Sequence, residues 1–300
     1  METLPEILRR AAKEQWATGH FNASELDQMR AIVEACTEVG APAIIGTSEG
    51  EGAHLGHAEA VAVRDVFRKE YGIPIFLNAD HHKNVEAAKK AIDAGYDSVH
   101  IDLSALAFEE NVQGTREAVV YARSKRQVPS AKFQINVEGE LGYLRGESKI
   151  QQQKIEVKPE DYTDPEQAKI FVEKTGVDRL AIAVGNIHGI SLDEPALDIE
   201  RIKAIRHAVS RNVALVLHAG SGIPDEQIRA AIGAGIANIH INTDLRVAFV
   251  QELRKTLEEH LEEAAMYKLD ATAIQAMKEM TKQKLQLFGS VGRIKYERIV

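Results

Sequence analysis

Short apolar runs alternate with amphipathic helical patterns along most of this 300-residue chain. Several runs are almost continuously apolar, which is typical of parallel strands covered on both faces. Eight strands are predicted, at 20–22, 41–48, 74–80, 98–104, 132–141, 179–186, 213–220 and 237–243. Helices are predicted at 25–40, 84–95, 110–125, 164–176, 198–210, 224–235 and 244–260. Eight evenly spaced strand–helix units favour an α/β fold of the (β/α)8 TIM-barrel type over the alternative, an open doubly wound sheet.

Two segments lie outside this alternation. Residues 140–164 form a long polar insertion after the fifth strand, and insertions of that length are usually functional or disordered. Residues 262–300 carry helical apolar spacing beyond what a barrel needs. We expect this helical tail to cap the barrel base or to contact another subunit of a homodimer or homotetramer. Residues 1–300 are predicted to form a single domain.

Composition narrows the class of protein. The net charge is −8 and the pI is about 5.8, which argues against a nucleic-acid or membrane-surface binder. Anionic small molecules remain compatible, because helix N-termini and metal ions supply positive potential. The N-terminal segment lacks the apolar core of a signal peptide, and Cys36 is the single cysteine. These features predict a cytoplasmic protein that acts on a small molecule, with no membrane span.

Three histidines, His81, His188 and His218, follow apolar runs near the ends of predicted strands. A single histidine in such a place is usually structural. In a barrel, however, the C-terminal ends of all strands converge on one mouth, so three equivalent histidines meet there. Three neutral imidazoles that leave one coordination position open suit a catalytic zinc ion.

Carboxylates accompany these histidines. Asp80 precedes His81, and neighbouring residues of a regular strand point to opposite sides, so the two can divide proton transfer and metal binding. Glu138 and Glu140 are two residues apart on one strand face, and one of them can bind or orient the metal. Asp102 lies near the end of the fourth predicted strand, where it faces the mouth or serves as a helix N-cap.

The last two strands end in small and hydroxyl residues. The segments 218–222 (HAGSG) and 240–244 (HINTD) each precede a helix. Barrels commonly bind phosphate at this position, through backbone N–H groups and the positive end of a helix. The alternative is an ordinary tight turn between strand and helix. Lysines suited to Schiff-base chemistry and motifs for nucleophilic catalysis are not evident in the sequence.

Taken together, several motifs resemble those of the class II, metal-dependent fructose-bisphosphate and tagatose-bisphosphate aldolases. They are FNASEL, LNADHHKN, VEGELGYLRG, AVGNIHG, LVLHAGSGIPDEQI and INTDLR, in that order along most of the chain. The resemblance implies that His81, His188 and His218 bind zinc, and that Asp80 is the acid/base for the C4 hydroxyl. It places Glu140 near the metal.

The resemblance also implies the remaining parts of the site. The loop after residue 141 would carry the carboxylate for the C3 proton, and Glu147 is its candidate. The residues expected around the substrate phosphate are Gly189, Ala219, Gly220, Ser221, His240, Asn242 and Thr243. Those expected to contact the distal part of the substrate are Asn22, Ser48 and Arg246. A monovalent cation often accompanies the phosphate in this family.

The chain departs from the family pattern at a few positions. His240 stands where the family usually has asparagine, and we expect a larger ring there that can be charged near neutral pH. Asn242 replaces an aspartate and Ala219 a glycine, but both keep a backbone N–H. The loop sequence RGES, from Arg145 to Ser148, holds one acid where the family has two.

These observations predict a zinc-dependent aldolase that cleaves fructose 1,6-bisphosphate to dihydroxyacetone phosphate and glyceraldehyde 3-phosphate. The first alternative is an aldolase for another phosphorylated ketose, such as tagatose 1,6-bisphosphate. The others are a barrel metallohydrolase that uses zinc-bound water and a non-catalytic paralogue that binds sugar phosphate.

Overall fold

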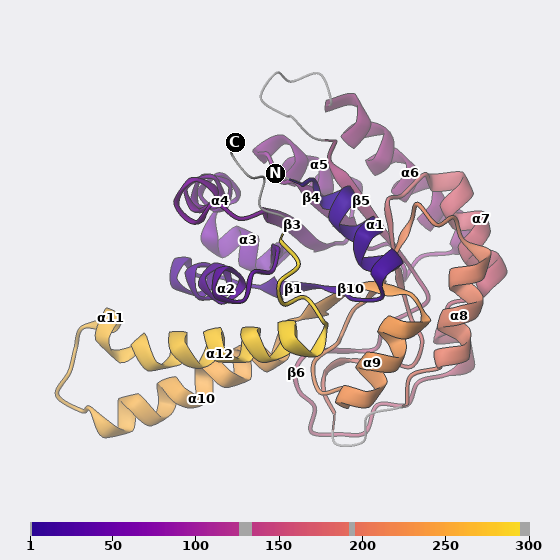
Figure 1. Cartoon of the computed structure of the whole chain (residues 1–300). Coiled ribbons are helices and arrows are strands. Elements are labelled where there is room, and N and C mark those ends of the chain that lie inside the picture. Colours follow the sequence, from indigo (N-terminus) through magenta and orange to yellow (C-terminus); the bar gives the residue numbers. More distant parts are fainter. Residues whose placement is uncertain (1, 126–133, 192–195, 295–300) are drawn as a thin grey trace.

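The computed structural model describes residues 2–125, 134–191 and 196–294, and its centre is a closed barrel of parallel strands (Figure 1). The barrel strands are β1 Thr18–Asn22, β2 Ala43–Ser48, β3 Ile75–His82, β4 Ser98–Ile101, β5 Asn136–Leu141, β7 Arg179–Ile182, β9 Ala214–Leu217 and β10 Ile236–Ile241. Their order around the barrel is β1-β10-β9-β7-β5-β4-β3-β2. Each coincides with a predicted strand, so the TIM barrel is confirmed. Residues 132 and 133 of the fifth predicted strand lie outside the described residues.

Helices surround the strands. They are α1 Leu4–Glu14, α2 Leu26–Val39, α3 Glu49–Leu55, α4 His57–Tyr71, α5 Val85–Ala94, α6 Phe108–Ser124, α7 Pro165–Thr175, α8 Ile199–Ala208, α9 Asp225–Ala234, α10 Thr243–Glu259, α11 Met266–Leu269 and α12 Ala271–Leu287, with a 3₁₀ turn at Pro159–Asp161. Helices α3 and α4 fill a gap in which no helix was predicted. Ser48 begins α3 with a capping box, in which its side chain accepts from Glu51 N and Glu51 accepts from its backbone.

Two parts of the chain close the barrel base. Leu4, Ile7 and Leu8 of α1 pack with Trp16 against the first residues of the strands. The tail helix α12 runs back along α10, and together they project from the barrel as a helical hairpin (Figure 1). The end of α12 then reaches the base, where the Ala17 N–H donates to the Phe288 carbonyl at 3.0 Å. The predicted helical tail is therefore present, and its end reaches the base.

The polar insertion contributes a second, two-stranded sheet. Its strand β6 (Gly146–Ile150) pairs in parallel with β8 (His188–Ile190), and Gly146 lies opposite His188. This pairing was not predicted, because its strands are short and come from loops that are distant in sequence. It fixes the insertion beside a histidine of the barrel mouth.

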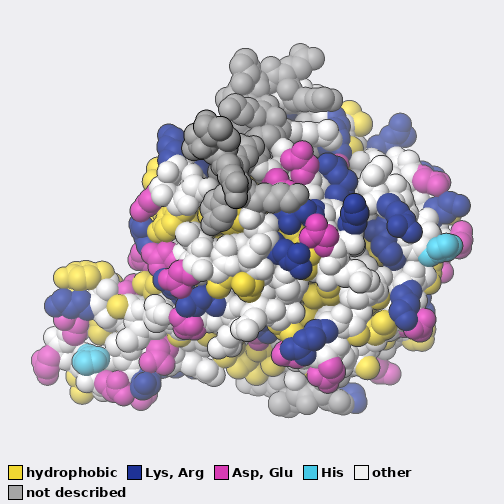
Figure 2. All heavy atoms as spheres, viewed as in Figure 1, with side chains coloured by type: hydrophobic (Ala, Val, Ile, Leu, Met, Phe, Trp, Pro, Cys, Tyr) yellow, Lys and Arg dark blue, Asp and Glu magenta, His cyan; other side chains and the backbone are white. Residues whose placement is uncertain are grey.

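The surface agrees with the composition. On the described part of the face in Figure 2, basic and acidic side chains are interspersed rather than gathered by sign. Across residues 2–125, 134–191 and 196–294, no helix is both long and apolar enough to cross a membrane.

Candidate active site

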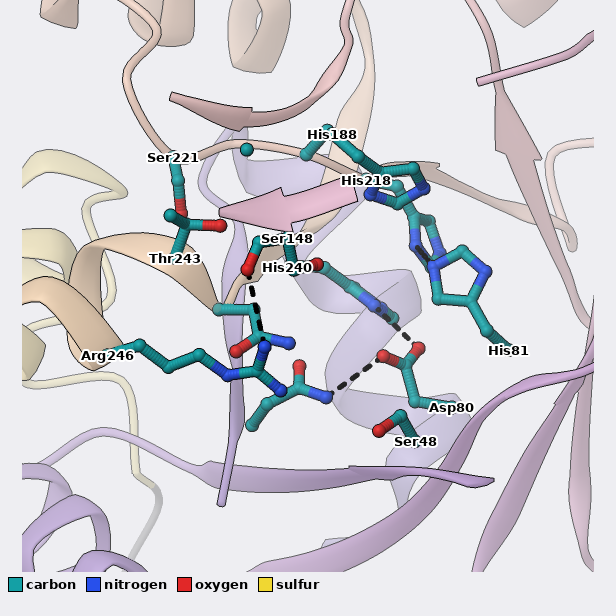
Figure 3. A pocket seen from close by; sticks show the side chains of 14 residues that line it. Ser48, Asp80, His81, Ser148, His188, His218, Ser221, His240, Thr243 and Arg246 are labelled. Atoms are coloured by element: carbon teal, nitrogen blue, oxygen red, sulfur yellow. Dashed lines mark hydrogen bonds and ion pairs between the residues drawn. The ribbon is translucent and has the colours of Figure 1, made fainter. Parts of the chain in front are cut away.

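A polar pocket of about 260 Å³ opens at the C-terminal ends of the barrel strands (Figure 3). Its lining residues are Asn22, Ser48, Asp80, His81, Ser148, His188, Gly189, His218, Ala219, Ser221, His240, Asn242, Thr243 and Arg246. All three predicted metal ligands and most of the predicted substrate contacts are therefore brought together. Glu140, Glu147 and Gly220 are not among the lining residues.

Asp80 and His81 both face this pocket, although they are neighbours on one strand. His81 has a left-handed backbone, with φ of 48°, and the pairing of β3 with β4 is irregular between Ala79 and His82. This irregularity breaks the alternation of side chains, so the expectation that the two residues point to opposite sides is wrong. A non-glycine residue in this conformation is typical of a functional site.

His81 and His218 point a ring nitrogen at each other. His81 Nε2 lies 3.0 Å from His218 Nδ1. Figure 3 shows the two rings beside each other. The other nitrogen of each ring faces a carboxylate: His81 Nδ1 is 2.8 Å from Asp102, and His218 Nε2 is 2.5 Å from Glu138. Each carboxylate accepts a ring N–H, so one proton or one bound cation is enough to link the two facing nitrogens.

This arrangement suits a metal ion. A proton shared between the facing nitrogens links the two rings, and a metal cation is able to take the place of that proton. Two nitrogens bound to one tetrahedral zinc are about 3.3 Å apart, which is close to the observed separation. His188 packs its ring against His81, with centroids 5.0 Å apart. Its nitrogens do not belong to the groups of ligand atoms that lie within 4.8 Å of one another among the described residues.

His100 is a candidate ligand that the sequence analysis did not identify. It is fully buried on β4, and its ligand atoms cluster with those of Asp80, His81 and His218. Its Nε2 lies 3.2 Å from Glu140 Oε2. Burial alone lowers the pKa of His100, but the neighbouring carboxylates, led by Glu138, raise it to about 10. Its position two residues before Asp102 on one strand face was the available signal.

Asp80 is held as a carboxylate. Its Oδ2 accepts from Asn22 Nδ2 at 3.1 Å, and its Oδ1 lies 3.3 Å from His240 Nδ1. Burial raises the pKa of Asp80, but the positive potential of His81 and the hydrogen bonds of His100 and His240 hold it well below its usual value. An anionic carboxylate beside the facing imidazoles is able to accept a proton from a bound hydroxyl.

His240 is part of a histidine stack inside the barrel. The centroid of its ring lies 3.5 Å from that of His20, and the two rings are almost parallel. The centroid of the His218 ring is 3.8 Å away. Its Nε2 lies 3.1 Å from Asn238 Oδ1. Burial holds the pKa of His240 well below its usual value, with His20 adding to the effect. The expectation of a ring that is charged near neutral pH is therefore wrong, because desolvation favours the neutral ring.

The predicted phosphate site lies at the start of α10. Gly189, Ala219, Ser221, Asn242 and Thr243 all line the pocket there. The Gly220 N–H donates instead to the His240 carbonyl at 3.0 Å, beyond the end of β9. Asp244 N donates to Ser221 Oγ at 3.1 Å, which fixes the hydroxyl at the helix N-terminus. The remaining N–H groups of this first turn can receive a phosphate.

The predicted loop base points away from the pocket. Glu147 lies on β6, its side chain is 75 % exposed, and it pairs with Lys149 at 2.7 Å. Lys149 also lowers the pKa of Glu147. Glu140 is deeply buried, and it accepts a hydrogen bond from Ser104 Oγ at 3.2 Å. In this structure, neither predicted carboxylate reaches the cavity.

Glu51 links three residues at the distal end of the pocket, and this role was not predicted. Its carboxylate pairs with Arg246 and accepts from Asn22 Nδ2 at 2.9 Å and from Ser48 N at 2.8 Å. Arg246 also donates to the Ser148 carbonyl at 3.3 Å. Glu51 is nearly buried on α3, so this contact required a helix that the sequence pattern did not reveal.

Comparison with known proteins identifies the family. The model of class II fructose-bisphosphate aldolases matches residues 2–293. A fructose-bisphosphate aldolase of Staphylococcus aureus (strain Mu50) is 36 % identical, over 98 % of this chain and 99 % of that protein. The solved YdjI aldolase of Escherichia coli K12 is 32 % identical with a TM-score of 0.81, covering 97 % of this chain and 98 % of its own.

A crystal structure of a putative fructose-1,6-bisphosphate aldolase from Coccidioides immitis has the same TM-score of 0.81 at 27 % identity, over 97 % of each chain. Family model, curated relatives and solved structures therefore agree over nearly the whole length. They agree also with the closed barrel observed here, whose mouth holds an aspartate and several imidazoles. This chain belongs to the class II fructose-bisphosphate aldolase family, whose members are metal-dependent lyases.

Proposed function

We propose that this protein is a zinc-dependent aldolase that reversibly cleaves fructose 1,6-bisphosphate to dihydroxyacetone phosphate and glyceraldehyde 3-phosphate. The observation that carries the proposal is the anionic Asp80 beside the facing nitrogens of His81 and His218. It provides a base for the substrate hydroxyl at the place where a metal is able to hold the ketone. The barrel scaffold and family membership support the same reaction class.

The residues divide the reaction between them. Asp80 accepts the proton of the C4 hydroxyl, the C4 oxygen forms the aldehyde carbonyl, and the C3–C4 bond breaks. Its electron pair passes to C3 and the C2 carbonyl, giving the enediolate of dihydroxyacetone phosphate. A proton then adds to C3, and we assign its delivery to Glu147 once the loop has moved, because loop closure commonly completes such sites. Glu140 is the second candidate for this proton.

His81, His188 and His218 would hold the metal, after a movement of His188, and His100 is a further candidate. When bound, the ion supplies a Lewis acid that stabilises negative charge on the reacting oxygens. Imidazole ligands suit zinc, but they also suit other first-row metals. The phosphate would lie at the start of α10, where we also place a monovalent cation.

The structure offers support for an assembly and for a compartment. Leu261, Met266 and Tyr267 lie at the tip of the α10–α12 hairpin, with exposed fractions of 83, 58 and 74 %. Large apolar side chains in such a projection are commonly covered by a partner, so we propose a homodimer or homotetramer.

The single cysteine, buried Cys36, is compatible with the cytoplasm, where we place the enzyme.

Another ketose phosphate is the second candidate substrate. His240 contacts Asp80 at 3.3 Å, and therefore lies where it is able to influence the configuration at C4. Tagatose 1,6-bisphosphate differs from the fructose ester at that carbon. The His240 contact therefore favours tagatose 1,6-bisphosphate as the second candidate substrate, after fructose 1,6-bisphosphate.

A retro-aldol assay over ketose mono- and bisphosphates tests the proposal, with Asp80→Ala as the variant. We expect a loss of roughly 10²–10⁴ in turnover, the usual contribution of a general acid/base, with metal content unchanged. Near-normal cleavage by Asp80→Ala would remove Asp80 from the reaction. Absence of cleavage of every ketose phosphate by the metal-loaded wild type would overturn the activity itself.

A further inference from the structure

Arg179 is a fully buried cation in the interior of the barrel. Barrel interiors are usually filled by branched apolar side chains, and an unpaired charge there is strongly unfavourable. Arg179 begins β7, and its guanidinium contacts residues of three other strands, β3, β5 and β10. It donates to the amide oxygens of Asn136 at 2.7 Å, Asn78 at 2.8 Å and Asn238 at 3.0 Å.

The fourth partner of Arg179 is Glu138. Arg179 Nη1 forms an ion pair with Glu138 Oε2 at 2.9 Å, and both side chains are fully excluded from solvent. Burial raises the pKa of Glu138, but the charge of Arg179 is the largest of the effects that hold it well below its usual value. The ion pair therefore holds the Glu138 carboxylate at a fixed position in the barrel interior.

Glu138 in turn fixes His218. Its Oε1 lies 2.5 Å from His218 Nε2, so the ring proton resides on Nε2 and the Nδ1 lone pair faces His81. The three residues form one line of contacts from the barrel interior to the proposed metal position. A carboxylate behind a ligand histidine orients the ring and increases its basicity.

We propose that Arg179 is a positioning residue for metal binding. It holds Glu138 in place, and Glu138 keeps His218 in the tautomer that presents Nδ1 to the ion. The inference rests on the metal dependence proposed above. It gives Arg179 a role in metal binding although Arg179 does not line the pocket.

The test is the zinc dissociation constant, measured by competition with a chromogenic chelator, for wild type, Arg179→Met, Arg179→Lys and Glu138→Gln. We expect Arg179→Met and Glu138→Gln to bind zinc about 10–100-fold more weakly, the usual effect of losing such a support. Arg179→Lys keeps the positive charge but lacks the several N–H donors of the guanidinium. The zinc affinity of this variant should therefore lie between those of wild type and Arg179→Met.

Arg64→Met is the matched control. Arg64 is also a nearly buried arginine paired with an acid, at 2.8 Å from Asp97, but it lies on α4 outside the pocket lining. The Arg64→Met substitution should lower the melting temperature and leave the zinc affinity unchanged. If Arg179→Met is insoluble, Arg179→Lys and Glu138→Gln together decide the question.

Wild-type zinc binding together with unchanged affinity in the folded Arg179→Met or Glu138→Gln protein overturns the positioning role alone. Wild-type protein that binds no metal overturns the proposed metal dependence, and this inference with it. The two failures are therefore distinguishable.

Discussion

His240 Nδ1 lies 3.3 Å from Asp80 Oδ1, so a residue outside the usual family pattern contacts the proposed acid/base directly. The same ring is stacked on His20 and packs against the tilted ring of His218, which leaves it little freedom to turn. Substrate selectivity near C4 is therefore expected to depend on this ring.

His240→Asn should raise the preference for fructose 1,6-bisphosphate over other ketose phosphates, because a compact amide replaces a larger neutral ring. The measurement is kcat/KM across the substrate panel. His57→Asn, which removes a histidine outside the pocket lining, is the control. An identical ranking of substrates in wild type and His240→Asn would show that the ring does not set specificity.

Glu51 and Arg246 should act in opposite directions on the distal phosphate. Arg246→Ala removes a cation at the pocket and should reduce kcat/KM for bisphosphates more than for monophosphates. Glu51→Gln releases Arg246 from its ion pair and should increase the relative rate with bisphosphates. Glu49→Gln, on the same helix but outside the pocket lining, controls for local effects. Equal effects on both substrate classes contradict this assignment.

Glu147→Gln tests the loop. The side chain now pairs with Lys149, so its function requires the loop to rearrange around substrate. We expect the variant to suppress solvent exchange of the C3 proton of dihydroxyacetone phosphate, followed by NMR. Undiminished exchange would assign the proton transfer elsewhere, and Glu140→Gln is then the variant to measure.

His20 should make stability pH-dependent. Burial lowers the pKa of His20 to about 3, whereas an unfolded chain protonates it near 6.5. Between these values the unfolded state binds the extra proton, so stability falls as pH falls below 6.5 and is unaffected above it. The contribution at pH 5 is about 2 kcal/mol.

Urea unfolding of metal-free wild type and His20→Gln at pH 7 and pH 5 measures this contribution. The loss of stability between the two pH values should be smaller in the variant by about 2 kcal/mol, because one buried neutral imidazole has been removed. An equal loss in both proteins would mean that His20 titrates normally in the folded state.

The fold and the site could be predicted to different extents from the sequence. The alternation of buried strands and helices sufficed for the barrel, and barrel geometry then brought His81, His188 and His218 to one mouth. The β6–β8 pairing escaped prediction because neither short strand has a pattern of its own. The turn at His81 depends on a local irregularity that alternation does not reveal.

The effects of burial on the charges of the site were the hardest feature to predict from the sequence. His240 was expected to be chargeable from its residue type, but burial, together with the rings of His20 and His218, keeps its pKa well below the usual value, against the effect of the nearby carboxylates. Arg179 likewise resembles an ordinary polar residue at the start of a strand. Its importance becomes visible only when Asn78, Glu138 and Asn238 are placed around it.

The most direct test of the account is retro-aldol turnover of fructose 1,6-bisphosphate after exhaustive chelation, with metal content measured by elemental analysis. We predict that activity falls to background in the metal-free protein and returns when one zinc ion per subunit is restored. His218→Ala should neither retain the metal nor regain activity. Full turnover by wild-type protein that contains no metal would contradict the account.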